Sequence, residues 1–131
     1  MTASKVRTID LITGAFDLSQ RRKFTINRPD GSPLCDLYFK PITRSDRMAV
    51  QAYAGTEDAV KISTQMLVHK AENEDGTPAF GQGDAVRLRR EIPESILNEL
   101  ELFLFGVGED EDLDKAKEDY RGIIGFILNF S

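Results

Sequence analysis

The sequence has a single cysteine, Cys35, and a single histidine, His69, among its 131 residues. One cysteine cannot form a disulfide within the chain, which indicates a reducing compartment, and we expect this thiol to be buried. One histidine and one cysteine are too few for a zinc site of ordinary composition. They also lack the local signature of a cysteine nucleophile with its base. The sequence therefore predicts no metal, no cofactor and no enzymatic activity.

Long apolar runs are missing as well. No stretch approaches the ~18 apolar residues that a membrane span needs. Near the N-terminus, Asp10 and Asp17 interrupt the apolar residues before the core of a signal peptide forms. These features predict a protein of the cytoplasm that does not enter a membrane.

Motifs for phosphate and calcium are incomplete. No glycine-rich loop carries the lysine of a phosphate-binding loop. Segment 71–82 has Asp75 and Gly76 where an EF-hand needs them, but Ala71 and Gln82 replace its two charged anchors. This segment is therefore predicted to be a plain Asp-Gly turn.

The charge is mostly negative and unevenly distributed. Residues 1–70 carry 11 Lys+Arg and 7 Asp+Glu, a net of +4, and residues 71–131 carry 6 and 15, a net of −9, which together give −5. Halves of opposite sign attract each other within one copy or between copies, although an acidic run can also be a solvated linker. The basic clusters 21–23 and 87–90 are short in an acidic chain, so we expect no nucleic-acid binding.

Turn and capping signals predict the fold class. Pro29-Asp30-Gly31 separates two alternating segments, which indicates a β-hairpin over 23–40 with one apolar face. The first 20 residues are weakly patterned. Helices are expected where capping residues precede apolar periodicity and glycine or proline ends it, over 44–54, 56–71, 83–90, 93–105 and, more weakly, 112–120. The class is mainly α, a small helical domain with an N-terminal β-hairpin, or α+β by strict counting.

The C-terminal part differs from the rest. We predict a hairpin-plus-helical domain over 1–106, followed by an acidic linker and an apolar tail over 107–131. An apolar tail beyond an acidic linker either folds back or meets a partner, and both readings remain open. Its candidate partner-binding residues are Ile123, Ile124, Phe126 and Ile127.

Five further segments follow one another in an order that is typical of a known protein family. They are Tyr38–Arg47, the helix that ends at Val68-His69-Lys70, Asp75–Phe80, Ile92–Leu100 and Leu113–Asp119. Together they cover roughly residues 36–131, and they resemble the tail assembly chaperones of long-tailed, lambda-like bacteriophages. Members of that family are similar in size, acidic and mostly helical. In many relatives a programmed ribosomal frameshift near the end adds a second domain.

The resemblance implies a non-enzymatic protein that binds the tape measure protein and helps recruit tail tube subunits. It also implies a place in the cytoplasm of the bacterial host and absence from the mature virion. A long helical client requires an exposed apolar face, and several copies can coat one client, which leaves self-association open. Alternatives are a structural phage protein retained in the virion, such as a head–tail connector, or a small regulatory protein-binding domain. A further candidate client face, for which core packing is the competing explanation, comprises Leu97, Leu100, Phe103 and Leu104.

Overall fold

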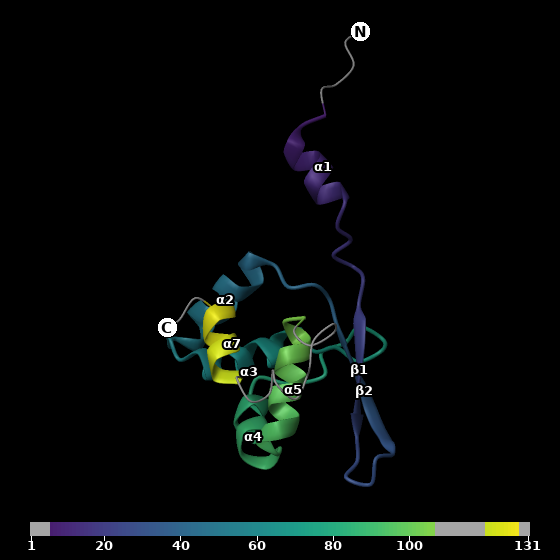
Figure 1. Ribbon diagram of the computed structural model, residues 1–131, viewed down its shortest axis with the longest axis vertical. Helices are drawn as coiled ribbons and strands as arrows, with labels where there is room; N and C mark the ends of the chain where they lie inside the picture. The colour runs from purple at the N-terminus through teal and green to yellow at the C-terminus, as the bar shows by residue number, and fades with distance from the viewer. Residues whose placement is uncertain (1–5, 107–119, 129–131) are drawn as a thin grey trace.

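The computed structural model describes residues 6–106 and 120–128. Within these ranges helices surround a core and a two-stranded hairpin covers one side of it (Figure 1). The predicted class, mainly α with an N-terminal β-hairpin, is confirmed. The elements in chain order are α1 (Thr8–Gly14), β1 (Arg22–Asn27), β2 (Pro33–Phe39), α2 (Arg44–Ala54), α3 (Ala59–Lys70), α4 (Asp84–Glu91), α5 (Glu94–Leu104) and α7 (Tyr120–Ile127).

The hairpin forms where the alternation predicts it. β1 and β2 are antiparallel, with Phe24 opposite Leu37. Gly31 adopts a φ of +91° in the turn, a conformation that glycine takes at little cost. Leu37 and Phe39 are buried against the helices, so the apolar face of the hairpin covers the core as a lone hairpin requires.

Cys35 is exposed, which contradicts the prediction of a buried thiol. It belongs to the same alternating face of β2 as Leu37 and Phe39. Of the strand's residues only Leu37 and Phe39, in its second half, are buried, and Cys35 lies nearer the turn. The alternation therefore identifies the face of the strand correctly, but not how far along the strand the core extends.

Capping residues set the helix boundaries. The Thr43 hydroxyl accepts from the backbone N–H of Asp46, and the Asp46 carboxylate accepts from the N–H of Thr43, which completes a capping box at the start of α2. Gly55, at a φ of +63°, ends this helix. α3 begins one turn later than the expected Thr56, because Asp58 caps it by accepting from the N–H groups of Val60 and Lys61.

The core is centred on α3. This helix packs against α2, α4, α5 and α7, and Figure 1 shows it in the middle of the helical body. Its side chains Ile62, Met66 and Leu67 have no exposed surface. Because neighbours cover α3 from several sides, its apolar residues are spread around the helix more widely than those of the outer helices.

α7 packs into the core of the helices that precede residue 106. Tyr120, Ile124 and Leu128 recur every four residues, so they share one helical face, and all three are buried in the same core as α3 and α5. The described part of the expected tail over 107–131 therefore folds back onto the domain expected to end at residue 106. The helix expected over 112–120 lies outside the described residues except for Tyr120.

α1 is an element that the sequence interpretation missed. It stands away from the helical body at the end of an extended segment (Figure 1), and none of its residues is buried. We call residues 6–20 the N-terminal arm.

Candidate functional site

The structure separates the eight candidate partner-binding residues by their exposure. Side chains in the core are not available to a partner while this fold is kept, and half of the set lies there. The four core residues are Leu97, Leu100, Leu104 and Ile124, the three half-buried ones are Phe103, Ile123 and Ile127, and Phe126 is 85% exposed.

The apolar face of α5 is turned inward because the hairpin and α3 both pack against it. Phe103 shows the packing, since its ring lies 5.1 Å from that of Phe24 and 5.9 Å from that of Phe39. The guanidinium of Arg22 lies over the Phe103 ring at 4.5 Å from the centroid. The face predicted to bind a client is thus an internal surface of the molecule.

Phe126 instead borders an open groove with a volume of about 450 Å³. We call it the Phe126 groove, and its lining residues are Ile42, Thr43, Arg44, Arg47, Phe105, Phe126 and Ile127. Arg47 is held at its edge, where it donates to the backbone oxygen of Leu128 at 3.4 Å. The groove therefore combines aromatic and aliphatic walls with two positive charges and no acidic lining residue.

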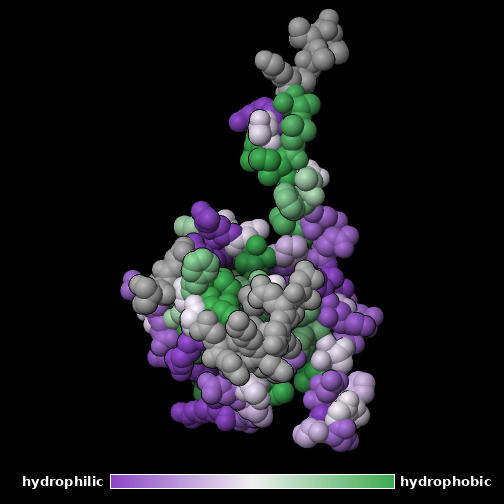
Figure 2. Space-filling model, viewed as in Figure 1, coloured by the Kyte–Doolittle hydropathy of each residue, from purple (hydrophilic) through white to green (hydrophobic). Residues whose placement is uncertain are grey.

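The N-terminal arm is the most apolar exposed part that the structure describes. Figure 2 shows apolar side chains covering much of its surface. Ile9 and Ile12 follow an i, i+3 spacing, so they share one side of α1, while Arg7 and Asp10 belong to the opposite side. Phe16 lies just beyond the end of the helix. The large apolar side chains that are at least half exposed here are Val6, Ile9, Leu11, Ile12, Phe16 and Leu18.

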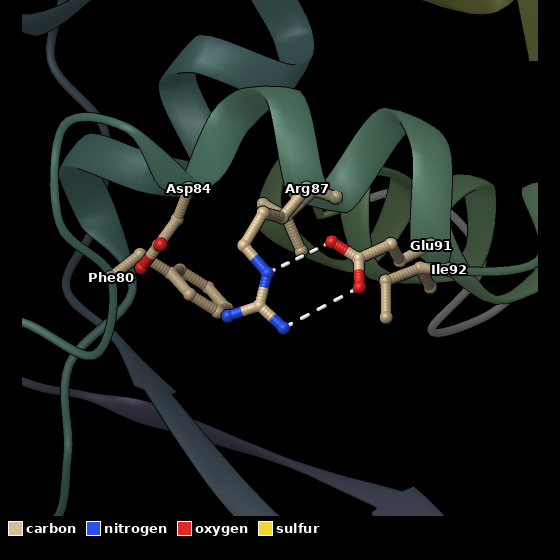
Figure 3. Close-up of a pocket in the computed structure, with 6 residues that line it drawn as sticks. Phe80, Asp84, Arg87, Glu91 and Ile92 are labelled. Carbon is tan, nitrogen blue, oxygen red and sulfur yellow. Dashed lines mark hydrogen bonds and ion pairs between the residues drawn. The ribbon is translucent and has the colours of Figure 1, made fainter.

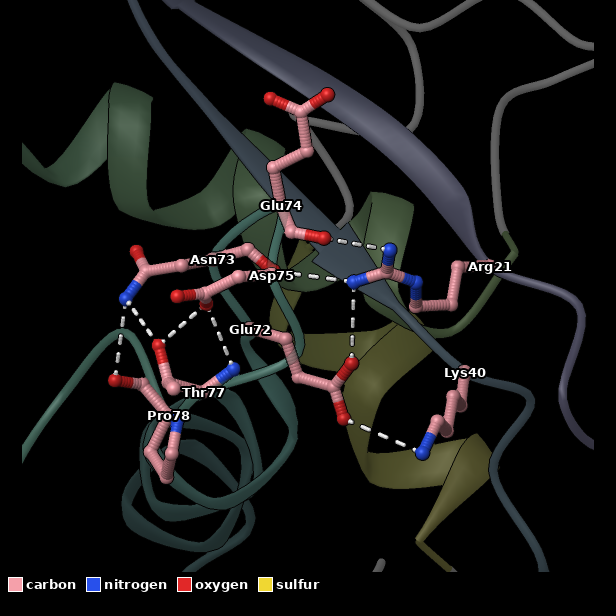
Figure 4. A network of polar contacts seen from close by, with 8 residues as sticks. All are labelled: Arg21, Lys40, Glu72, Asn73, Glu74, Asp75, Thr77 and Pro78. Atoms are coloured by element: carbon pink, nitrogen blue, oxygen red, sulfur yellow. Dashed lines mark hydrogen bonds and ion pairs between the residues drawn. The ribbon is translucent and has the colours of Figure 1, made fainter.

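Two arginines fix the base of the arm to the body. Figure 4 shows the Arg21 guanidinium beside the turn after α3, where it donates to the carbonyl oxygens of Asn73 at 3.0 Å and Glu74 at 2.8 Å. Arg22 donates to the carbonyl oxygens of Phe103 at 2.8 Å and Leu104 at 3.1 Å, at the C-terminal end of α5. The last residues of that helix are where a positive charge is most favourable. The arm therefore leaves the body from a fixed point.

The turn that receives Arg21 is the one tested above as a calcium loop. The Asp75 carboxylate accepts from the N–H of Thr77 at 3.0 Å and from its hydroxyl at 2.6 Å, and Gly76 has a φ of +88°. The hydrogen bonds from Thr77 lower the pKa of the Asp75 carboxyl. Asp75 thus serves the turn itself, as the sequence predicts, and Figure 4 shows the network around it.

A second groove lies between the hairpin and α5, with a volume of about 550 Å³. We call it the hairpin groove. Its apolar walls come from both sides, because β1 and the start of α5 each turn aliphatic side chains toward it. The residues that line it are Phe24, Thr25, Ile26, Asn27, Arg28, Pro29, Ile92, Pro93, Ser95, Ile96 and Glu99.

A smaller hollow of about 220 Å³ lies beside α4 (Figure 3). The Arg87 Nε donates to the Glu91 carboxylate at 2.9 Å on one side of the hollow, and Phe80 also lines it. Hydrogen bonding and charge from Arg87 lower the pKa of the Glu91 carboxyl. The charges of Arg87 and Glu91 neutralise each other one helical turn apart, and Asp84 adds one negative charge to the lining of this hollow.

One acidic side chain, Glu101, is fully buried. Its carboxylate accepts from the hydroxyls of Ser63 at 2.5 Å, of Thr64 at 3.1 Å and of Tyr120. Burial raises the pKa of the Glu101 carboxyl, and the three hydroxyl hydrogen bonds offset only part of that effect. Burial and the neighbouring carboxylate also raise the pKa of the Tyr120 phenol.

The Glu101 cluster connects three helices of the core. Ser63 and Thr64 lie on α3, Glu101 on α5 and Tyr120 on α7, so one carboxyl group links three helices. None of the three grooves described above includes any of these residues. A carboxyl group enclosed in the core stabilises the packing of helices and is not placed to meet a substrate.

Within residues 6–106 and 120–128, no three His, Cys, Asp or Glu side chains are grouped closely enough to hold a metal ion. Nor does the described part of the chain contain a helix long and apolar enough to cross a membrane. Comparison of the chain with protein-family models, with curated proteins and with solved structures found no match.

Proposed function

We propose that this protein is a non-enzymatic tail assembly chaperone of a long-tailed bacteriophage, which binds the tape measure protein and helps recruit tail tube subunits. The order of segments between residues 36 and 131 supports the family, as the sequence analysis describes. The observation that carries the binding role is Phe126, an aromatic side chain 85% exposed at the edge of an open groove.

The client contact is the Phe126 groove. An amphipathic helix that lies in such a groove inserts its apolar residues and leaves its polar side at the rim. Phe126 and Phe105 provide aromatic surface, which contributes much of the binding energy of interfaces in general. Arg44 and Arg47 add positive charge, so the segment that fits is a helix with an apolar stripe flanked by Asp or Glu.

Phe126→Ala tests this role. Truncation of a central aromatic in an interface typically costs about 2 kcal/mol or more, so binding of the tape measure protein should weaken roughly 30-fold or more. The measurement is co-purification and titration with a fragment of a tape measure protein. Folding should be unchanged, because Phe126 is exposed. Met48→Ala, an exposed apolar residue on α2, is the matched control and should bind normally.

Two results would contradict the proposal. One is a wild-type protein that does not co-purify with the tape measure protein at all. The other is its recovery from purified virions as a regular component, which would favour a structural phage protein such as a head–tail connector. A chaperone should act in the host cytoplasm and be missing from finished particles.

A further inference from the structure

We propose that the N-terminal arm of one copy docks in the hairpin groove of a second copy, and that copies of this chain assemble through this contact. The inference goes beyond the client-binding role, because it concerns contacts between copies in the absence of any other phage protein. It rests on an unpartnered helix and an unfilled groove that belong to the same chain.

The arm has an apolar stripe that its own body does not cover. Ile9 and Ile12 form one side of α1, and the exposed Phe16 follows just after the helix ends. Phe16 is 69% exposed, and no residue of α1 is buried. Clustered apolar surface of this kind marks an interaction site in a folded protein.

The hairpin groove offers the matching surface. Phe24 and Ile26 line it from β1, and Ile92 and Ile96 line it from the segment that enters α5. Each of the four is partly buried against the core, so the groove has a firm floor and an open side. Its volume of about 550 Å³ accommodates several large side chains of a short amphipathic helix.

The charge at the hairpin-turn end of the groove favours one direction for the arm. β1 and α5 run antiparallel, because Arg22 at the start of β1 contacts the end of α5, whereas Pro29 and Pro93 share the other end of the groove. Glu99 therefore lies toward the first end and Arg28 at the hairpin turn. An arm that places its Asp17 end toward Arg28 brings opposite charges together at that end of the groove.

The position of the arm favours a second copy over its own body. Arg21 and Arg22 fix the base of the arm at the end of β1 that is far from the hairpin turn. From there the arm extends away from the body and away from the hairpin turn (Figure 1). The arm would have to reverse its direction at this fixed base to reach the groove of its own chain, whereas a neighbouring copy can approach it directly.

Disulfide trapping between two differently tagged copies tests the contact. Both carry Cys35→Ser, which removes the exposed native thiol. One copy carries Ala15→Cys in the arm, and the other carries Ser95→Cys in the groove, both at exposed positions. We expect a disulfide between the two tags after mild oxidation. A partner with Met48→Cys, an exposed position on α2, is the control and should give little product.

The solution mass gives a second readout. The wild-type chain, at 14.7 kDa per copy, should show a mass that rises above one copy with concentration. Ile12→Asp should shift this rise to at least tenfold higher concentration, and Met48→Asp should leave it in place. A wild-type protein that stays monomeric, or equal trapping at Ser95→Cys and Met48→Cys, would overturn the proposal. So would an intrachain disulfide in a monomeric variant that carries both Ala15→Cys and Ser95→Cys.

These results are separable from the client-binding role. Assembly is measured with the isolated protein, and Phe126→Ala should not change it because Phe126 does not line the hairpin groove. A protein that assembles but ignores the tape measure protein would support the arm contact and contradict the chaperone role. A protein that binds the tape measure protein but stays monomeric would support the chaperone role and contradict the arm contact.

Discussion

Glu101 is the side chain whose chemistry depends most on its surroundings. A carboxyl group with no exposed surface is destabilised in its charged form, and here three hydroxyls stand in for water. The Ser63 hydroxyl also lies 2.9 Å from the Val60 carbonyl oxygen. When Glu101 is protonated, the Ser63 proton can therefore turn to Val60, so the cluster has a satisfied arrangement in either state.

The raised pKa of Glu101 predicts a pH dependence of stability. Its folded-state pKa lies above the ordinary value of 4.5, so its stabilising contribution is complete below pH 4.5 and is lost as the pH rises through the folded pKa. Glu101→Gln keeps the shape and cannot ionise. We expect the free energy of unfolding of the wild type, relative to this variant, to fall from pH 4.5 upward.

Denaturant unfolding of both proteins across this pH range measures the difference. Glu91→Gln is the control, because the pKa of the exposed Glu91 carboxyl is lowered by Arg87 and its small effect should have the opposite sign. A pH-independent difference between the wild type and Glu101→Gln would show that this carboxyl group keeps its ordinary pKa in the folded protein.

Among the helices, α7 extends the folded domain beyond residue 106, because it packs in the core. Tyr120 joins the Glu101 cluster, and Ile124 and Leu128 fill the space beside α3. The helix therefore contributes to the same core as the helices that precede residue 106. We therefore expect truncation after Gly106 to destabilise the whole domain.

Ile124→Ala measures what α7 contributes. Removing a fully buried isoleucine side chain typically costs about 2–5 kcal/mol, a large part of the roughly 5–15 kcal/mol that stabilises a domain. Thermal unfolding should shift down by on the order of 10 °C. Phe126→Ala on the same helix should change stability by less than about 0.5 kcal/mol, since that ring is exposed. Equal melting of the two variants would mean that α7 does not pack on α3.

The sequence predicts some elements well because their signals are local. The signals for the helix over 44–54 and for the Pro29-Asp30-Gly31 turn each act within a few residues, and the structure has both elements. The direction in which an apolar face points depends on distant neighbours, so Leu97 and Leu100 could not be assigned to core or surface. Glu101 shares their face by its i+4 spacing, but a charged residue there is ordinarily read as exposed.

For the molecule as a whole, the arm was overlooked for a related reason. Ile9, Ile12 and Phe16 have helical spacing, but the segment is short, and its acidic residues drew the interpretation toward an interrupted signal peptide. The arm buries nothing in its own chain, so no packing requirement in the rest of the sequence points to it.

Removing residues 1–20 should leave the body folded. The arm has no buried residue, and the anchoring Arg21 and Arg22 would remain. We expect a melting temperature within a few degrees of that of the full chain, on the order of the change from a surface substitution. Circular dichroism and calorimetry measure it. A shortened protein that fails to fold would show that the arm belongs to the core.

The two anchoring arginines also affect how a protease meets the chain. Trypsin cleaves after lysine and arginine, but it needs the side chain and the backbone free to enter its active site. Arg21 and Arg22 hold carbonyl oxygens of the body, whereas Arg7 lies exposed on the arm. Cleavage should therefore start at Arg7 and pause before β1, so that docking of the arm becomes visible as resistance of Arg7 to digestion.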